Sequence, residues 1–244
     1  MRLLFPEFVE TVEPAEIYAD LPTAEGRPSV RLNMIVSVDG GTSWNGVSGA
    51  LGGPADKALF SILRSLTDVV LVASGTMRAE SYGPATLPSE IQAARRARGQ
   101  QPIPPIAVVS STCRFDWDSP FFSAATSRPY IVTVSSADGD ARKQASEVAE
   151  VIIAGEDSVD LTVAVTELGA RGAGNILAEG GPTLNGELAK AGLLDELCVT
   201  LAPLLASGDA KRFIAGSTLA ELLHLRLRSI CEADEYLFLR YRPA

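Results

Sequence analysis

The feature that most constrains the fold is a series of short apolar runs rich in β-branched residues, each bounded by Gly, Pro, Ser or Asp. The runs occupy residues 30–38, 68–73, 105–110, 130–134, 150–155, 175–179 and 197–203. Runs of this length and composition are typical of strands that are buried on both faces of a sheet. They therefore predict a central sheet in which most strands are parallel.

Segments with helical periodicity separate several of these runs. Within residues 53–66 the apolar residues recur at helical spacing, at Leu59, Ile62, Leu63 and Leu66. A second helix is expected in residues 88–100, with Ser89 as its N-cap. Two further helices are expected in residues 157–172 and 182–194.

The two ends of the chain have patterns of their own. Residues 1–29 contain Pro6, Pro14, Pro22 and Pro28, and we interpret this segment as an irregular arm laid over the domain. Residues 223–242 alternate apolar and polar side chains, which predicts an antiparallel hairpin. Residues 30–244 are thus expected to form one α/β domain, with helices flanking a mostly parallel sheet and an antiparallel hairpin at its C-terminal edge.

Composition and charge limit the classes of function. A net charge of -9 and a pI of about 4.7 argue against binding to nucleic acid or to an anionic membrane surface. No apolar run approaches the roughly 20 residues of a membrane-spanning helix, and the start of the chain lacks a secretory signal. We therefore expect a cytoplasmic protein. With one histidine and no C-x-x-C pair, no metal site is expected.

Polar residues mark the end of the first predicted strand. Asn33, Ser37 and Asp39 share parity, so an extended strand would direct all three to one face. Polar side chains on an otherwise apolar strand are costly unless they meet partners or a ligand. An ordinary Asp-Gly turn accounts for Asp39 alone, but the three residues together indicate a site.

The next strand ends in Ser74, Gly75 and Thr76. Small residues allow a ligand to approach the backbone, and hydroxyl groups and amides can hold a phosphate or a ribose. An ordinary strand-to-helix turn explains the same residues equally well.

A third strand end combines a carboxylate, two glycines and a helix start. Gly180 and Gly181 would leave room for a pyrophosphate, and the amides that follow Pro182, beginning with Thr183, would face it from a helix N-terminus. Glu179 ends the buried strand beside this turn. No G-x-G-x-x-G motif accompanies it, so the usual dinucleotide fingerprint is absent.

These segments resemble a known family. Residues 33–41, 69–84 and 176–203 are similar, in order and spacing, to the reductase domain of bacterial riboflavin biosynthesis, and most closely to its stand-alone actinobacterial branch. The resemblance extends from about Val30 to the C-terminus. It implies a dihydrofolate reductase-like fold, NADPH as the cofactor, and a homodimer.

The resemblance also implies which residues bind the cofactor. The turn of Gly180, Gly181, Pro182 and Thr183 would hold the pyrophosphate. Thr76 and Glu80 would border the cofactor, with Glu80 where the family usually has Asp, and Gly75 lies beside them. Ser110 is the candidate for the adenosine-ribose end, with Arg114 nearby to favour a 2′-phosphate.

On the substrate side, the resemblance places Ser48 and Arg64 near the ribose phosphate of the substrate, and it makes Asp39 and Glu179 the candidate catalytic carboxylates. Asn33 and Ser37 complete the expected substrate-binding set. The chain departs from the family here. Asn33 replaces the usual Lys, Ser61 replaces a His, and the family's Asp-x-Pro becomes residues 80–84.

The implied reaction is hydride transfer from NADPH to a carbon–nitrogen double bond of a pyrimidine-type substrate. In the family this substrate is 5-amino-6-(5-phosphoribosylamino)uracil. Reduction of dihydrofolate, a pterin, is an alternative that the loss of Lys at Asn33 favours and the retained Arg64 opposes. A third possibility is a protein that binds NADPH without turnover.

Overall fold

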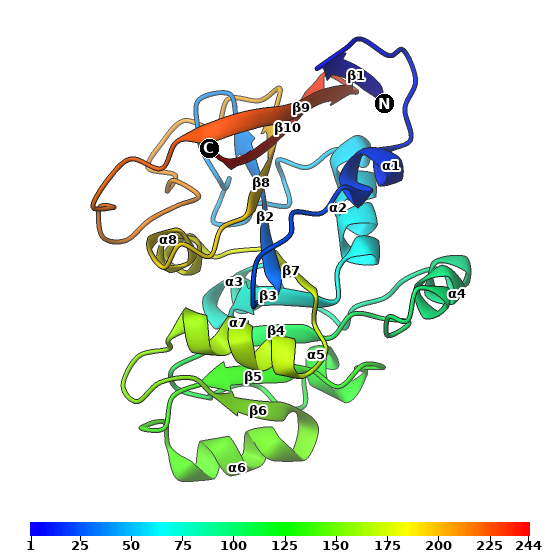
Figure 1. Cartoon of the computed structure of the whole chain (residues 1–244). Coiled ribbons are helices and arrows are strands. Elements are labelled where there is room, and N and C mark those ends of the chain that lie inside the picture. Colours follow the sequence, from blue (N-terminus) through cyan, green and yellow to red (C-terminus); the bar gives the residue numbers. More distant parts are fainter.

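A ten-stranded sheet runs through the computed structural model, which describes residues 1–244 (Figure 1). Across the sheet the strand order is β1-β9-β10-β8-β2-β7-β3-β4-β5-β6. In chain order the strands are β1 (Arg2–Phe5), β2 (Ser29–Ser37), β3 (Val69–Ala73), β4 (Ile106–Val109), β5 (Tyr130–Thr133), β6 (Glu150–Ile153), β7 (Asn175–Ala178), β8 (Glu196–Ala202), β9 (Leu225–Ala233) and β10 (Tyr236–Pro243).

The direction of the strands agrees with the sequence pattern. All neighbouring pairs from β8 through β2, β7, β3, β4 and β5 to β6 are parallel. The pairs of β10 with β8 and β9, and of β9 with β1, are antiparallel. The seven apolar runs correspond to β2 through β8, and the C-terminal alternation corresponds to the β9–β10 hairpin. The predicted α/β fold, mostly parallel with an antiparallel C-terminal hairpin, is therefore confirmed.

Helices cover the sheet on both faces and are, in chain order, α1 (Pro14–Ala19), α2 (Pro54–Leu66), α3 (Ser74–Ala79), α4 (Ser89–Ala97), α5 (Pro120–Ser123), α6 (Gly139–Val148), α7 (Leu161–Ala170) and α8 (Pro182–Lys190). Successive side chains of a strand point to opposite faces. In β3, Val69 and Leu71 accordingly pack in the cluster that includes α7 and α8, whereas Val70 and Val72 pack in the cluster that includes α5 and α6. None of the helices is both long and apolar enough to cross a membrane.

The expected N-cap of α4 is wrong by one residue. Pro88 occupies the N-cap position with an extended backbone, and Ser89 is already the first helical residue. The Ser89 hydroxyl contacts the adjacent Glu90 carboxylate rather than capping the helix. A proline with an extended backbone and a serine can each stand at the position before the first helical residue. The sequence pattern does not show which of the two does so here.

The interpretation of residues 1–29 as irregular is also wrong. The segment contains β1, which pairs with β9 at the edge of the sheet, and the short helix α1, which starts at Pro14 (Figure 1). The four residues of β1 and the six of α1 are too few to give a clear periodicity. The division of the chain at residue 29 stays a prediction.

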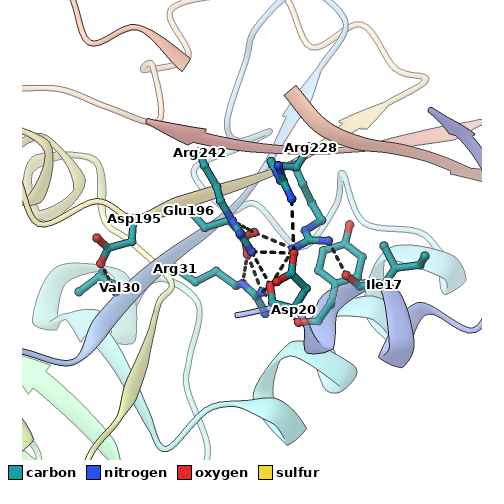
Figure 2. A network of polar contacts seen from close by, with 10 residues as sticks. Ile17, Asp20, Val30, Arg31, Asp195, Glu196, Arg228 and Arg242 are labelled. Atoms are coloured by element: carbon teal, nitrogen blue, oxygen red, sulfur yellow. Dashed lines mark hydrogen bonds and ion pairs between the residues drawn. The ribbon is translucent and has the colours of Figure 1, made fainter. Parts of the chain in front are cut away.

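Buried charges hold this N-terminal segment in place (Figure 2). The Glu196 side chain is fully buried and accepts hydrogen bonds from Arg31 at 2.5 Å and Arg240 at 2.7 Å. The same arginines donate to carbonyl groups at the end of α1, Arg31 to Tyr18 at 3.0 Å and Arg240 to Ile17. The Tyr18 ring packs in a cluster with α2. The network thus holds α1 in the position in which Tyr18 packs against α2.

Candidate active site

Two adjoining cavities lie at the carboxyl ends of β2, β3 and β7. The α2 cavity, of about 370 Å³, is bounded by α2 and the segment after α3. The glycine-turn cavity, of about 690 Å³, is bounded by the turn before α8 and by residues 206–211. The residues that line both cavities are Met34, Ser48, Thr76, Glu80 and Glu179. Open α/β sheets bind ligands at this edge, so the pair of cavities is the candidate active site.

Glu179 lies at the junction of the two cavities and forms a buried ion pair. Its two oxygens accept from Arg64, Oε1 from Nε at 2.7 Å and Oε2 from Nη2 at 2.6 Å. The Tyr82 hydroxyl donates to Oε2 at 2.8 Å. A two-point contact with a planar guanidinium sets the orientation of the carboxylate as well as its charge. Glu179 is therefore held in one position where the cavities meet.

Aromatic rings enclose Arg64. Its guanidinium carbon lies 4.3 Å from the centroid of the Phe60 ring and 5.4 Å from that of Tyr82. Burial disfavours the guanidinium charge, but the charge of Glu179 outweighs this and raises the pKa of Arg64 above its ordinary value. Burial, with the charge of Glu179, also raises the pKa of Tyr82 well above its usual range. Tyr82 therefore remains a neutral hydrogen-bond donor.

The two residues of the glycine turn favour glycine for different reasons, Gly180 because of its backbone angle and Gly181 because of limited space. Gly180 has a φ of +92°, a region that favours glycine, and a cis peptide bond joins it to Gly181. A Cβ atom at Gly181 would lie 2.5 Å from the Thr76 hydroxyl oxygen. Helix α8 begins at Pro182 without a side-chain cap, and the amides of Thr183 and Leu184 have no hydrogen-bond partner. Free amides at a helix start suit an anion such as a pyrophosphate.

Glu80 connects the two cavities to the loop before α2. Its Oε1 accepts from the backbone amide of Ser48 at 2.7 Å. Ser48, Thr76 and Glu80 all line both cavities. Glu80 thus fixes part of the partition between them.

Most of the predicted site residues lie around these cavities. Asn33 and Arg64 line the α2 cavity, Gly75, Gly181 and Pro182 line the glycine-turn cavity, and Ser48, Thr76, Glu80 and Glu179 line both. Five predicted residues line neither cavity, and these are Ser37, Asp39, Ser110, Gly180 and Thr183. Gly180 and Thr183 are direct neighbours of lining residues. Ser110 follows β4, where its amide donates to Val132, so any contact with the cofactor would lie beyond the glycine-turn cavity.

Ser37 and Asp39 interact with each other and with nearby backbone rather than with a cavity. The Ser37 hydroxyl donates to Asp39 Oδ1 at 2.5 Å and accepts from the Gly41 amide at 2.9 Å. The hydrogen bond from Ser37, followed by those from the amides of Ala206 and Ser207, lowers the pKa of Asp39 to about 2. The shared parity with Asn33 predicts a common face only while the strand continues, and β2 ends at Ser37.

The side chains of the α2 cavity that sequence reasoning missed include Asp56, Lys57, Phe60 and Tyr82. The first three share with Arg64 the cavity-facing side of α2, at helical spacing. Burial raises the pKa of Asp56, while the Thr200 hydroxyl and the Lys57 charge oppose that shift. The signal that the sequence offered for these residues was the apolar spacing on the opposite face of α2, where Leu59 and Leu63 are buried. No cluster of three or more His, Cys, Asp or Glu side chains could hold a metal ion.

Comparisons with known proteins agree with this geometry. The family described as the RibD C-terminal domain matches residues 28–239. A protein of Methanothermobacter thermautotrophicus named 2,5-diamino-6-ribosylamino-4(3H)-pyrimidinone 5′-phosphate reductase is 29% identical over 221 residues, which cover 88% of this chain and 98% of the relative. The protein of the same name in Aquifex aeolicus is 29% identical, with 83% and 91% covered.

A solved structure is similar along almost its whole length. The pyrimidine reductase-like protein of Corynebacterium diphtheriae superposes with a TM-score of 0.84 at 28% identity, and the alignment covers 96% of this chain and 99% of that one. The fold, the strand-end cavities and the match of the family over most of the chain lead to one conclusion. The chain belongs to the RibD C-terminal domain family.

Proposed function

We propose that this chain is an NADPH-dependent reductase of riboflavin biosynthesis that acts on a ribosylaminopyrimidine 5′-phosphate. The observation that carries the proposal is the position of Glu179, oriented by Arg64 and Tyr82 at the junction of two cavities. One cavity suits the cofactor and the other the substrate. The substrate class is supported by relatives named as reductases of such a compound.

The glycine-turn cavity fits the cofactor. The free amides of Thr183 and Leu184, directly after the lining residue Pro182, suit its pyrophosphate, and the missing side chain of Gly181 makes room for the Thr76 hydroxyl beside it. Gly75 and Pro182 form the neighbouring wall. When bound, the nicotinamide supplies a hydride to the substrate carbon. The task of the chain is to hold donor and acceptor in contact and to exclude water.

The α2 cavity supplies the groups that would hold the substrate. Reduction of a carbon–nitrogen double bond adds a hydride to carbon and a proton to nitrogen. Glu179 forms an ion pair with Arg64 and can accept hydrogen bonds from ring amino or amide groups. Asp56 forms no ion pair and has a raised pKa, so we propose that it is the group that delivers the proton. Lys57, which also lacks an ion-pair partner, is available to the substrate phosphate.

One observation favours the pterin alternative. Arg64 is committed to Glu179, so Lys57 is the remaining cation in the lining of the α2 cavity, beside the carboxylates of Asp56 and Glu80. Such a lining suits a flat, donor-rich heterocycle enclosed by Phe60 and Tyr82 as well as a sugar phosphate. Dihydrofolate is therefore the competing substrate.

The test follows NADPH absorbance with purified protein in three parallel reactions. These contain 5-amino-6-(5-phosphoribosylamino)uracil, its 2,5-diamino-pyrimidinone counterpart, and dihydrofolate. Faster oxidation with either ribosylaminopyrimidine supports the proposal, and the ratio of the two identifies the substrate. Faster oxidation with dihydrofolate would instead identify the protein as a reductase of a pterin. Binding of NADPH without consumption would leave a cofactor-binding protein without turnover.

Glu179→Gln tests the residue that carries the proposal. The amide keeps the size of the side chain but removes the charge that pairs with Arg64. We expect the Kd for NADPH to change little and kcat to fall at least tenfold, because one of the two acceptor oxygens becomes an NH₂ donor and the negative charge is lost. Glu187→Gln is the matched control, since Glu187 lies on the outer side of α8 with an exposed side chain. Full activity of the Glu179 variant would remove this residue from the site.

A further inference from the structure

The Asp39 carboxylate accepts hydrogen bonds from backbone amides of a segment that is distant in the sequence. Its Oδ1 accepts from the amide of Ala206 at 3.1 Å, and its Oδ2 accepts from the amide of Ser207 at 2.7 Å. The hydroxyl of Ser37 donates to Oδ1 as a third partner. The carboxylate lies on the surface, in the turn after β2, and lines neither cavity. It is therefore directed at the backbone of residues 204–211, here called the 204–211 segment.

The 204–211 segment forms one wall of the glycine-turn cavity, which its residues 206–211 line. It contains no helix or strand. Apart from a hydrogen bond from the Leu204 amide to the nearby Ala202 carbonyl, its hydrogen bonds with the rest of the chain come from the turn at residues 38–42. Besides Asp39, the Val38 amide donates to the Leu204 carbonyl at 2.9 Å, and the Thr42 hydroxyl donates to the Lys211 carbonyl at 2.8 Å. The position of this wall thus depends on a few contacts with one turn.

Close packing accompanies these hydrogen bonds. A Cβ atom at Gly41 would lie 3.0 Å from the Ala206 Cβ and 3.2 Å from the Ala210 Cβ. The turn and the segment are therefore in direct contact, and the missing side chain of Gly41 allows it. Without the fixed amides of Ala206 and Ser207, few other interactions would hold the segment against the cavity, because it has no regular secondary structure of its own.

We propose that Asp39 is a positioning residue, which holds the 204–211 segment in place as a wall of the cofactor cavity and does not contact the substrate. That the glycine-turn cavity binds NADPH rests on the proposed function, whereas the attachment of the 204–211 segment by Asp39 does not. An aspartate is suited to this role because each ionised oxygen accepts from a backbone amide. In Asp39→Asn one of the two oxygens becomes an NH₂ group, which would face an amide N–H donor.

Trypsin measures the fastening directly, without ligand or activity. The bonds after Lys211 and Arg212 lie at the end of the segment. Asp39→Asn should accelerate cleavage at these two bonds several-fold, as followed by mass spectrometry of the fragments. Thr42→Val should do the same, because it removes the contact to the Lys211 carbonyl and leaves every carboxylate intact. Asp157→Asn, at an exposed aspartate without hydrogen-bond partners, is the matched control and should cleave at the wild-type rate. Wild-type cleavage of the Asp39 variant would overturn the proposal.

Cofactor binding distinguishes positioning from catalysis. In Asp39→Asn, the Kd for NADPH, measured by fluorescence titration, should rise several-fold, while kcat at saturating NADPH stays within a few-fold of wild type. Thr42→Val serves only in the trypsin comparison, because Thr42 itself lines the glycine-turn cavity. A large fall in kcat for Asp39→Asn, with an unchanged Kd, would mean that Asp39 acts on the substrate and would refute the positioning role. If the wild type binds no NADPH, the proposed function fails, and the trypsin comparison still decides whether Asp39 holds the segment.

Discussion

Glu179 shows how one residue serves two cavities. Its backbone amide donates to Leu71 in β3, and its carboxylate faces Arg64 and Tyr82. The next residues form the glycine turn, whose Gly180 carbonyl accepts from the amide of Ala73 at 2.7 Å. A short stretch of chain at the end of β7 therefore positions both the carboxylate at the junction of the two cavities and the backbone of the glycine-turn cavity.

The contact between Gly181 and Thr76 can be tested by a pair of substitutions. Gly181 has ordinary backbone angles, so a side chain there is limited by space and not by φ. In Gly181→Ala the new Cβ would meet the Thr76 hydroxyl at 2.5 Å, and we expect a loss of about 1–3 kcal/mol in the free energy of unfolding from overpacking. Adding Thr76→Ala should restore most of it in urea denaturation. No recovery in the double variant would contradict this account.

The raised pKa of Asp56 leads to a prediction of how the stability of the protein depends on pH. Burial raises its folded pKa above the unfolded value, so the folded state binds more protons than the unfolded state between those two values. Asp56 therefore lowers the stability of the protein as pH rises from about 4 through the raised pKa. Asp56→Asn should remove this pH-dependent contribution to stability. The Tm of the variant minus the Tm of the wild type should therefore increase as pH rises through that window. A difference independent of pH would contradict it.

At the scale of elements, α2 combines two functions on opposite sides. Leu59 and Leu63 pack in the cluster with Tyr18 of α1, while Phe60 and Arg64 face the cavity. The position of the cavity-facing residues consequently depends on what holds the outer side. That support is the network around Glu196, which fastens the end of α1 (Figure 2).

Removing the charge of Glu196 should therefore destabilise the protein strongly. In Glu196→Gln the buried guanidinium group of Arg31 loses its counter-ion and that of Arg240 loses its closer one, and removing one partner of a buried pair costs about 3–5 kcal/mol. Glu232→Gln is the control, because its partner Arg2 is half-exposed and the pair is screened by water. Urea denaturation should give a much larger change for Glu196. Equal changes would mean that the network contributes no more than a surface pair.

At the scale of the whole molecule, the sheet ends in an uncovered apolar region. Strand β1 forms one edge, and the side chains of Leu4, Phe5, Phe8 and Val9 there are exposed, Phe8 by 62%. Exposed apolar groups gathered at one edge are typical of an interface. The homodimer predicted from the family resemblance would be accounted for by pairing through this edge.

Light scattering tests the dimer. We expect a mass twice the 25.7 kDa of the chain, and a shift toward the monomer in Phe8→Asp, where a charge would be buried in the interface. Leu222→Asp, at a side chain 86% exposed in another part of the molecule, should leave the mass unchanged. A monomeric wild type would contradict the dimer, and a dimeric Phe8 variant would place its interface elsewhere.

Local patterns were sufficient for most of the fold. Strands β2 to β8 each lie in a short apolar run rich in β-branched residues, and the β9–β10 hairpin alternates clearly, so their type could be read from neighbouring residues. Strand β1 and helix α1 could not, because they are short and are stabilised by partners in β9 and around Glu196. In the site, Glu179 and Gly181 were predicted because a carboxylate and glycines at a strand end form a local signal.

The sequence by itself determined strands β2 to β10 and the glycine turn, since hydrophobic period and glycine content act over a few residues. Tertiary structure decided which side chains meet. Tyr82 reaches Glu179 across 97 residues, and Asp39 reaches Ser207 across 168. Such pairs depend on strand order and on the course of loops beyond the strand ends. The parity that groups Asp39 with Asn33 holds only within a strand, and β2 ends before Asp39. The chain therefore turns Asp39 toward the wall of one cavity and leaves Asn33 in the lining of the other.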